Sequence, residues 1–194
     1  MGNKEFMRKA IELSVENVKN GGGPFGAVIV KGDEIVATGV NRVTAHNDPT
    51  AHAEVSAIRE ACRRLGTFDL SGCEIYTSCE PCPMCLGAIY WAHLDKIYYG
   101  NNKDDAADIG FDDSFIYEEL ALPRQNRKKA MEELLPEEAI AAFDLWRNTA
   151  SPPPRPPTGR AARCPAHPPA APPSRDRRST AAPAPQSAGS APSS

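Results

Sequence analysis

Bulky apolar side chains are missing from the end of this 194-residue sequence: residues 151–194 contain no Phe, Tyr, Trp, Leu, Ile, Val or Met. Thirteen of the 19 prolines lie there, together with six arginines and one aspartate. A segment without such side chains cannot build a core, so we expect residues 151–194 to be a disordered tail rich in Pro, Ala, Arg and Ser. This composition is also typical of GC-rich coding DNA translated in a shifted frame, and both interpretations stay open.

The preceding residues, 1–150, have the composition of one folded domain. They carry 16 Lys and Arg against 24 Asp and Glu, a net charge of −8, whereas the tail carries +5. A domain of this size buries enough surface to form a core without disulfides. The acidic body makes nucleic acid an unlikely partner, because Lys and Arg contacts with phosphates supply most of the affinity for it.

Long apolar runs and an N-terminal signal sequence are also missing. The first turns mix charged with apolar residues, and no stretch approaches the roughly 20 apolar residues that a membrane span needs. The sequence has six cysteines, and cysteines that serve as metal thiolates suit a reducing compartment. We therefore expect a cytoplasmic protein without membrane association.

Alternating helical and extended patterns predict an α/β fold. Strands joined by helices imply a three-layer α/β/α arrangement, a mixed sheet of about five strands covered by helices. The patterns predict helices near residues 6–18, 52–66 and 82–91, and strands at 25–30, 35–40, 73–77 and 96–99, the first two joined as a hairpin. Residues 128–135 fit either a helix or a short last strand, and a further helix is expected from Pro136.

Two short motifs contain the residues suited to catalysis, His52-Ala53-Glu54 and Pro81-Cys82-Pro83-Met84-Cys85. His52, Cys82 and Cys85 offer the three protein ligands typical of a catalytic zinc, which leaves a fourth position for water. Glu54 offers a carboxylate that can transfer protons. Together, H-x-E and P-C-x-x-C form the signature of the zinc deaminases.

The spacing within the motifs predicts where their helices begin. Cys82 and Cys85 are three residues apart and share one helix face. Pro83 is favoured at the first helical position, which makes Cys82 the cap and places both sulfurs at a helix N-terminus, where thiolates are stabilised. Residues two apart diverge by about 200° on a regular helix, so His52 must precede its helix. The apolar run that continues to Trp91 predicts a buried helix.

Other interpretations of the cysteines exist. A C-x-x-C pair also occurs in redox proteins and structural zinc sites, and Cys79, Cys82 and Cys85 could begin an iron–sulfur motif. That motif needs a fourth cysteine soon afterwards, and none occurs before Cys164. A zinc site of four thiolates would leave the His52 motif unexplained. We interpret Cys79, like Cys62 and Cys73, as a small buried hydrophobic residue.

Longer stretches carry a resemblance to a known family: Asn41, Asp48–Glu54, Tyr76–Trp91, Gly110–Tyr117 and Phe143–Asn148. Together they look like bacterial guanine deaminase, a member of the cytidine-deaminase-like superfamily. The similarity runs over most of residues 3–122 and returns at 143–148. The zinc motif is specific only to the superfamily, whereas the other stretches narrow the resemblance to purine deaminases.

The resemblance implies zinc-dependent hydrolysis of guanine to xanthine and ammonia, with Zn²⁺ held by His52, Cys82 and Cys85 and attack at C2 of the purine base. Glu54 would carry the proton from water to the ring nitrogen and then toward the leaving amine. Asp113 would engage the exocyclic amine and assist its departure. An ordinary interpretation of Asp113, as part of a solvated acidic loop, stays open.

The resemblance also assigns substrate-binding positions. Asn41 would hydrogen-bond the purine edge, Phe25 would stack on the ring, the backbone around Ala53 would contact the ring, and Trp91 would lie near the pocket. Structural roles stay open for some of these residues, since Asn41 could form a turn after a strand and Phe25 could belong to the core. Glu80 matches a position near the site and could instead brace the metal-binding helix.

The resemblance further implies a homodimer whose subunits exchange their C-terminal segments. Family members end soon after the stretch that matches 143–148, with an aromatic residue that closes over the purine, and this sequence has no aromatic residue after Trp146. Two other functions stay open. A tRNA adenosine deaminase shares the zinc residues and much of their second helix, and a non-catalytic module would use a structural zinc and the tail as a binding arm.

Overall fold

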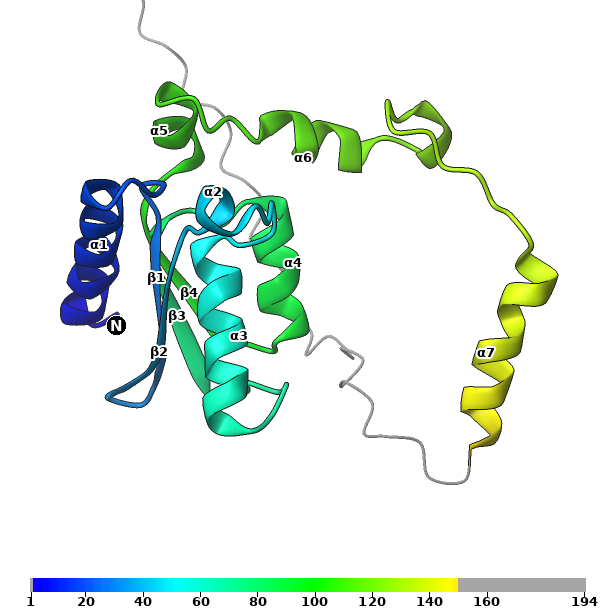
Figure 1. Ribbon diagram of the computed structural model, residues 1–194, viewed down its shortest axis with the longest axis horizontal. Coiled ribbons are helices and arrows are strands. Elements are labelled where there is room, and N and C mark those ends of the chain that lie inside the picture. Colours follow the sequence, from blue (N-terminus) through cyan, green and yellow to red (C-terminus); the bar gives the residue numbers. More distant parts are fainter. Residues whose placement is uncertain (1, 150–194) are drawn as a thin grey trace, which may run out of the picture. The chain divides into compact units, whose positions relative to one another are not determined.

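One mixed sheet of four strands forms the centre of the computed structural model, which describes residues 2–149 (Figure 1). In the order β2-β1-β3-β4, the strands are β2 (Glu34–Val40), β1 (Gly26–Lys31), β3 (Cys73–Cys79) and β4 (Lys96–Asn101). β1 runs antiparallel to β2 and β3, and β3 runs parallel to β4. The predicted tail at 151–194 lies outside the described residues.

Helices cover both faces of this sheet, which confirms the expected three layers. α1 (Lys4–Lys19) packs on one face, and α3 (Ala53–Leu65) and α4 (Pro83–Trp91) pack on the other (Figure 1). The shorter helices and the last helix are α2 (Val43–His46), α5 (Lys103–Asp108), α6 (Ser114–Ala121), the 3₁₀ turn η1 (Arg124–Asn126) and α7 (Pro136–Asn148). Within the described part of the chain, no helix is long and apolar enough to cross a bilayer.

The alternation of side chains along β1 builds two separate halves of the core. Ala27 and Ile29 belong to the cluster under α3 and α4, whereas Val28 and Val30 belong to the cluster under α1. Successive residues of a strand point to opposite faces, so a strand covered on both faces must be apolar throughout. The continuous apolar run in this part of the sequence follows from that arrangement.

The strand count differs in one detail from the expectation of about five. Residues 127–135 form neither a helix nor a strand, and β4 has no second neighbour within residues 2–149. This segment contains the charged pairs Lys128-Lys129 and Glu132-Glu133, so it offers no alternating apolar face to pack on a sheet. The helix predicted from Pro136 is present as α7.

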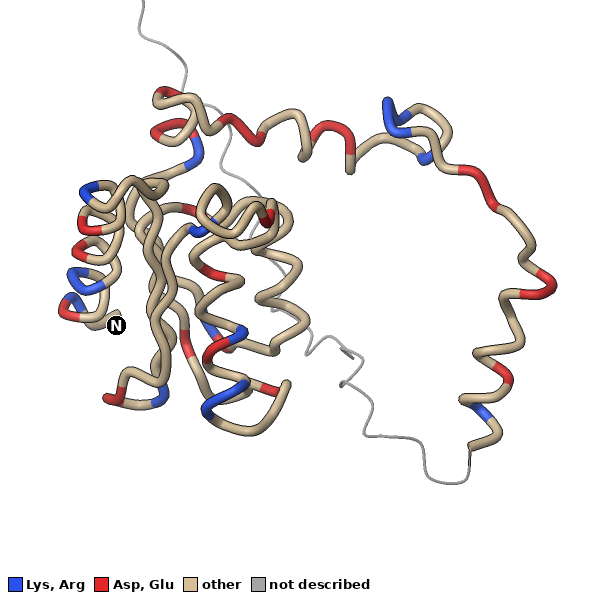
Figure 2. The backbone as a smooth tube through the Cα atoms, in the orientation of Figure 1, with Lys and Arg blue, Asp and Glu red and all other residues tan. Residues whose placement is uncertain are grey.

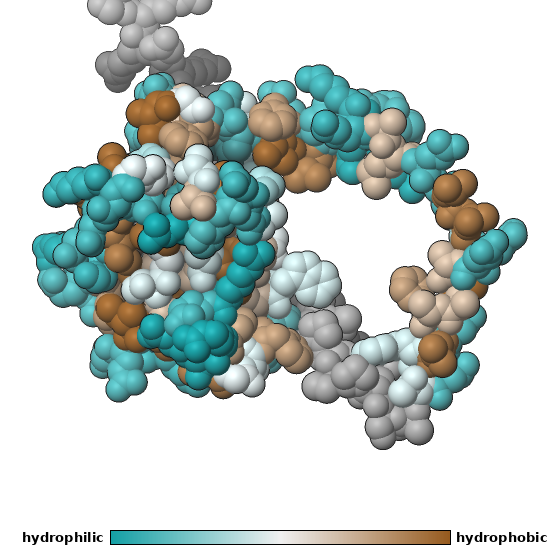
Figure 3. Space-filling view, in the orientation of Figure 1, coloured by the Kyte–Doolittle hydropathy of each residue, from teal (hydrophilic) through white to brown (hydrophobic). Residues whose placement is uncertain are grey.

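The prediction that the helix ending at Trp91 is buried is only half right. Cys85 and Ile89 are buried on the inner face of α4, but Tyr90 is 73% and Trp91 68% exposed. Apolar side chains also lie on the surface of α6 and α7 (Figure 3). A helix that is apolar all round cannot show from its sequence which of its faces the same chain covers.

Candidate active site

The two predicted metal-binding segments form the first residues of α3 and α4. His52 is the N-cap of α3 with extended backbone angles (φ −68°, ψ 161°), and Cys82 is the N-cap of α4 (φ −63°, ψ 167°). Pro83 occupies the beginning of α4, and Gly66 ends α3 in the left-handed conformation (φ 66°). The predicted helix boundaries are therefore confirmed. Because His52 lies just outside the regular helix, its side chain can face the same site as Glu54.

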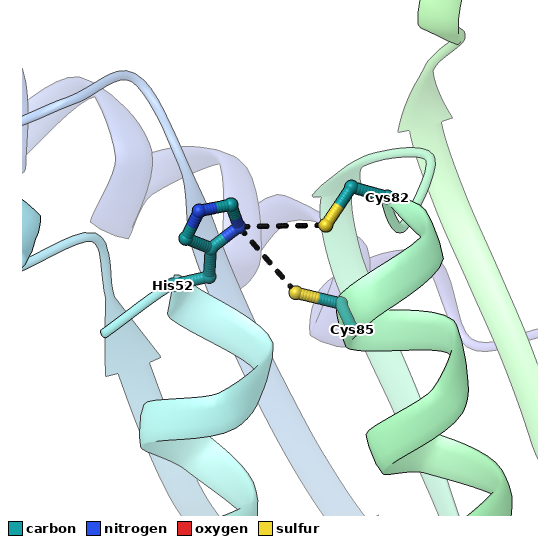
Figure 4. A group of neighbouring side chains, drawn as sticks. All are labelled: His52, Cys82 and Cys85. Carbon is teal, nitrogen blue, oxygen red and sulfur yellow. Dashed lines mark hydrogen bonds between the residues drawn. The ribbon is translucent and has the colours of Figure 1, made fainter. Parts of the chain in front are cut away.

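The side chains of His52, Cys82 and Cys85 converge from two helices (Figure 4). Nδ1 of His52 lies 3.6 Å from Sγ of Cys82 and 3.5 Å from Sγ of Cys85. All three potential ligand atoms lie within 4.8 Å of one another. A nitrogen and a sulfur bound to one tetrahedral zinc at the usual bond lengths are roughly 3.5 Å apart. The donor set and its spacing thus fit Zn²⁺.

Hydrogen bonds within this cluster prepare one thiolate. The hydrogen bond with Cys85, followed by that with His52, lowers the pKa of the Cys82 thiol to about 4. The neighbouring Cys82 and burial raise the pKa of Cys85, and the hydrogen bond with Cys82 raises the pKa of His52. Zinc binds thiolates and neutral imidazole. Metal binding must therefore displace a proton from Cys85 and keep His52 neutral.

Glu54 lies beside the metal-binding cluster without belonging to it. Its side chain is buried, with Oε2 3.4 Å from Sγ of Cys85, and the hydroxyl of Thr77 donates a hydrogen bond to Oε1 over 3.3 Å. Burial raises the pKa of the Glu54 carboxyl. A carboxyl with a raised pKa can accept and return a proton at neutral pH, which suits general acid–base chemistry.

A cavity of about 380 Å³ opens next to this cluster. It is lined by Gly23, Phe25, Asn41, Val43, Thr44, His52, Glu54, Glu80, Cys82, Ala106, Phe111, Asp112 and Asp113. Small-molecule sites typically enclose about 300–1,000 Å³, so the cavity has the size for a compact heterocycle. The fold therefore brings Phe25, Asn41 and Asp113 together with Glu54 and two of the metal-binding residues.

Two of the predicted substrate-binding residues do not line this cavity. Ala53 is fully buried at the first position of α3, and Trp91 lies exposed at the last position of α4. Their substrate-binding roles stay predictions. Glu80 does line the cavity, and its Oε2 also accepts a hydrogen bond from the backbone N–H of Lys103 over 3.2 Å. Glu80 thus braces the segment that begins α5 as well as facing the cavity.

Sequence reasoning did not single out two residues that belong to the site. Phe111 packs edge-on against Phe25, with ring centroids 5.0 Å apart at 87°. Thr77 contacts Glu54. Thr77 could have been found from its position two residues after Ile75 in β3. Residues two apart in a strand share a face, and Ile75 faces α3 and α4.

The part of the chain that builds this site matches a known family. Residues 2–101 match the cytidine and deoxycytidylate deaminase zinc-binding region. The chain is 52% identical over 152 residues to the guanine deaminase of Bacillus subtilis (strain 168), which covers 78% of this chain and 97% of that protein. This chain belongs to the guanine deaminase family of zinc deaminases. The family resemblance, the cytidine-deaminase-like fold and the zinc cofactor expected from the sequence are confirmed.

Solved structures agree with this assignment. The X-ray structure of the Bacillus subtilis enzyme matches with a TM-score of 0.74, covering 77% of this chain and 96% of that chain. A structure of guanine deaminase from Nitrosomonas europaea, 36% identical, matches with a TM-score of 0.56 over 58% of this chain and 65% of that chain.

A relative with a different activity matches over a shorter part of the sequence. A tRNA-specific adenosine deaminase of Aquifex aeolicus (strain VF5) is 43% identical over 51% of this chain and 66% of that protein.

Gly39 allows α3 to approach the sheet closely enough to place the metal-binding residues. A Cβ at this position would lie 2.2 Å from the carbonyl oxygen of Ala53 and 2.5 Å from the backbone nitrogen of Ala57. We expect Gly39→Ala to displace the first turn of α3, to lower the free energy of unfolding by about 1–3 kcal/mol and to weaken zinc binding. Thermal unfolding and zinc per chain are the measurements. The control is Gly87→Ala, since a Cβ there meets nothing within 4 Å; equal effects of both substitutions would contradict this explanation.

Proposed function

We propose that this chain hydrolyses guanine to xanthine and ammonia in purine salvage or catabolism. The observation that carries the proposal is the position of Glu54, a buried carboxyl beside the His–Cys–Cys cluster and on the wall of a small cavity. The identity to an enzyme with this activity over most of the chain supports guanine as the substrate. Structures of a related protein with 2,6-diaminopurine and 8-azaguanine support a purine base as the ligand class.

Different residues of the cavity would have different roles in the reaction. Zinc bound by the cluster would lower the pKa of a water molecule to about 7 and so supply a nucleophile at neutral pH. We propose that Glu54 takes one proton from the attacking water and passes it to the ring nitrogen beside C2. It would then take the second proton from the hydroxyl added at C2 and deliver it to the amine, which leaves as ammonia when the C–N bond breaks. Proton transfer of this kind contributes about 10²–10⁴ to the rate. Asp113, also on the cavity wall, would hold the exocyclic amine and assist its departure.

Two cavity residues are suited to bind the ring. Oδ1 of Asn41 already accepts a hydrogen bond from the backbone N–H of Val43 over 3.3 Å, so its amide N–H groups are directed to other acceptors, such as those of a purine edge. We propose that Asn41 donates to that edge while Phe25, held edge-on by Phe111, stacks on the ring. The backbone around Ala53 would complete the contacts.

The similarity to tRNA-specific adenosine deaminases makes tRNA deamination the second candidate. The charge around the cavity disfavours it. Glu80, Asp112 and Asp113 line the cavity, and further aspartates follow along α5 (Figure 2). A phosphate backbone would be repelled there, because nucleic-acid affinity comes from Lys and Arg.

Side-by-side assays decide between the two candidates. The zinc-loaded chain is given guanine, adenine, cytidine and a tRNA anticodon stem-loop, and ammonia release and base products are measured. We expect turnover of guanine and none of the stem-loop. Deamination of the stem-loop without any conversion of guanine would overturn the proposal.

We further propose a homodimer with exchanged C-terminal segments, a cytoplasmic location and a catalytic domain made of residues 1–150. The dimer is supported by the apolar side chains exposed on α4 and α7, such as Tyr90, Trp91, Phe143 and Leu145, because surfaces of this kind mark contacts with other chains. Sedimentation of the full chain as a monomer at micromolar concentration would contradict the dimer.

The cytoplasmic location is supported by the thiolate ligands, which suit a reducing compartment.

Thr77 is expected to orient the carboxyl of Glu54. Thr77→Val keeps the shape of the side chain and removes its hydroxyl, and we expect it to lower kcat for guanine about tenfold, the effect of losing a hydrogen bond of roughly 1.5 kcal/mol. Thr77→Ser retains the hydroxyl and should restore most of kcat. If Thr77→Val turns over guanine as fast as the unchanged chain, the hydrogen bond has no part in the reaction.

A further inference from the structure

A single buried amide at the end of α1 joins the two segments that form one wall of the cavity. Asn17 is 4% exposed. Its Nδ2 donates hydrogen bonds to the carbonyl oxygen of Gly23 over 2.8 Å and to that of Asn41 over 2.9 Å. The amide of an asparagine has two N–H donors, and both are used here. Nothing else on the side chain could replace them, because its Oδ1 is an acceptor.

Each of these carbonyl groups belongs to a segment that lines the cavity. Gly23 lies in the loop between α1 and β1, and its carbonyl also accepts from the N–H of Phe25 over 2.8 Å. Asn41 directly follows β2, and its N–H donates to the carbonyl of Phe25 over 3.1 Å. Gly23, Phe25 and Asn41 all line the cavity. Asn17 therefore holds the backbone on both sides of Phe25.

The loop is packed directly against these amides. The backbone carbonyl of Asn17 accepts from the N–H of Gly22 over 2.8 Å. A Cβ at Gly22 would lie 2.4 Å from Nδ2 of Asn17, and a Cβ at Gly23 would lie 3.1 Å from Cγ of Asn41. The loop thus packs closely against the Asn17 side chain. Loss of the Asn17 amide must move the loop or leave the buried carbonyl of Asn41 without this donor, while the carbonyl of Gly23 keeps only the N–H of Phe25.

We propose that Asn17 is a positioning residue for substrate binding, which acts through Asn41 and Phe25 without touching the substrate. This inference rests on the proposed function. The metal-binding residues begin α3 and α4 and receive no hydrogen bond from Asn17, so zinc binding does not depend on it. Asn41 and Phe25 contact the ring before and during the reaction. Loss of their positions thus weakens binding without a matching loss of kcat.

The test compares the zinc-loaded full chain with Asn17→Ala and Asn17→Asp. We expect KM for guanine and Kd for the product xanthine to rise about tenfold in Asn17→Ala, the effect of one unmet buried hydrogen bond, with kcat and zinc per chain nearly unchanged. Asn17→Asp should raise both constants at least as far, because its carboxylate faces two carbonyl oxygens. The control is Ser14→Ala, one turn earlier in α1, whose buried hydroxyl bonds only to the carbonyl of Ile11 within the helix.

The outcomes separate this inference from a merely structural role and from the proposed function. Values of KM and Kd within twofold of the unchanged chain, or an equal rise in Ser14→Ala, overturn the inference. If Asn17→Ala and Asn17→Asp do not fold, Asn17→Ser, which keeps one donor in place of two, must raise KM with zinc retained, and an unchanged KM overturns the inference. An unchanged chain that converts no guanine shows instead that the proposed function is wrong, and the inference with it.

Discussion

Replacement of Glu54 by Gln should leave zinc bound and lower guanine turnover by about 10²–10⁴, the usual contribution of a general acid–base residue. Gln keeps the shape of the side chain and can still accept a hydrogen bond from Thr77, but it cannot take up or release a proton at neutral pH. Because Glu54 is not among the three side chains of the metal-binding cluster, its substitution should not empty the site. Steady-state assays measure the loss of guanine turnover, and elemental analysis of zinc per chain measures metal retention.

The same substitution tests the structural-zinc interpretation. A protein that only uses zinc to hold its fold would keep its function in Glu54→Gln and Glu54→Ala. Loss of zinc from either variant would contradict the role given to Glu54, since it would make the carboxyl a ligand. Asp113→Asn is an informative companion, because Asp113 also lines the cavity but is not among the three potential ligands, so the substitution should lower turnover without affecting zinc.

Cys82→Ser should lose zinc and activity, whereas Cys79→Ser should lose neither. Cys82 is one of three potential ligands, and removal of a direct ligand should weaken zinc binding by more than about 100-fold, since even a hydrogen-bond partner of a ligand contributes 10–100-fold. Burial raises the pKa of the Cys79 thiol to about 11, and its Sγ donates to the carbonyl of Asn102 over 3.6 Å. Cys79 lies outside the group of three potential ligands and its thiol is hydrogen-bonded to a backbone carbonyl, so we expect it to bind no zinc.

The comparison of these two cysteines also tests the alternatives for the C-x-x-C-x-x-C run. Zinc per chain by elemental analysis, together with the melting temperature, distinguishes loss of metal from loss of fold. If zinc were retained in Cys82→Ser, or lost in Cys79→Ser at an unchanged melting temperature, a different set of thiolates would hold the metal. Cys85→Ser should behave as Cys82→Ser does.

The geometry at the metal-binding cluster could be predicted because it depends on short-range rules. Pro83 fixes the backbone at the start of α4 and so places Cys82 at the cap. The separation of His52 from Glu54 by two residues requires that one of them lie outside the helix. Both requirements are met in the fold, and both come from residues that are neighbours in the chain.

Contacts across the sheet could not be predicted in the same way. The hydrogen bond between Thr77 and Glu54 joins β3 to α3, and that between Asn17 and Asn41 joins α1 to the end of β2. Each depends on the order and register of the strands, which the periodicity of one segment does not contain. Residues 127–135 are a different case, since the edge of β4 is unpaired within residues 2–149 and the charged residues of this segment offer no alternating apolar face for it.

By itself, the sequence predicted the three-layer class from hydrophobic periodicity, and it predicted from two short motifs the His–Cys–Cys cluster and the carboxyl that the fold places beside it. These patterns involve residues a few positions apart in the chain. Only the tertiary structure decided which face of α4 stays exposed, that Phe111 supports Phe25, and that the amide of Asn17 holds the cavity wall. Those features arise where segments from different parts of the chain meet, and their energies depend on burial and hydrogen-bond geometry that exist only after the chain has folded.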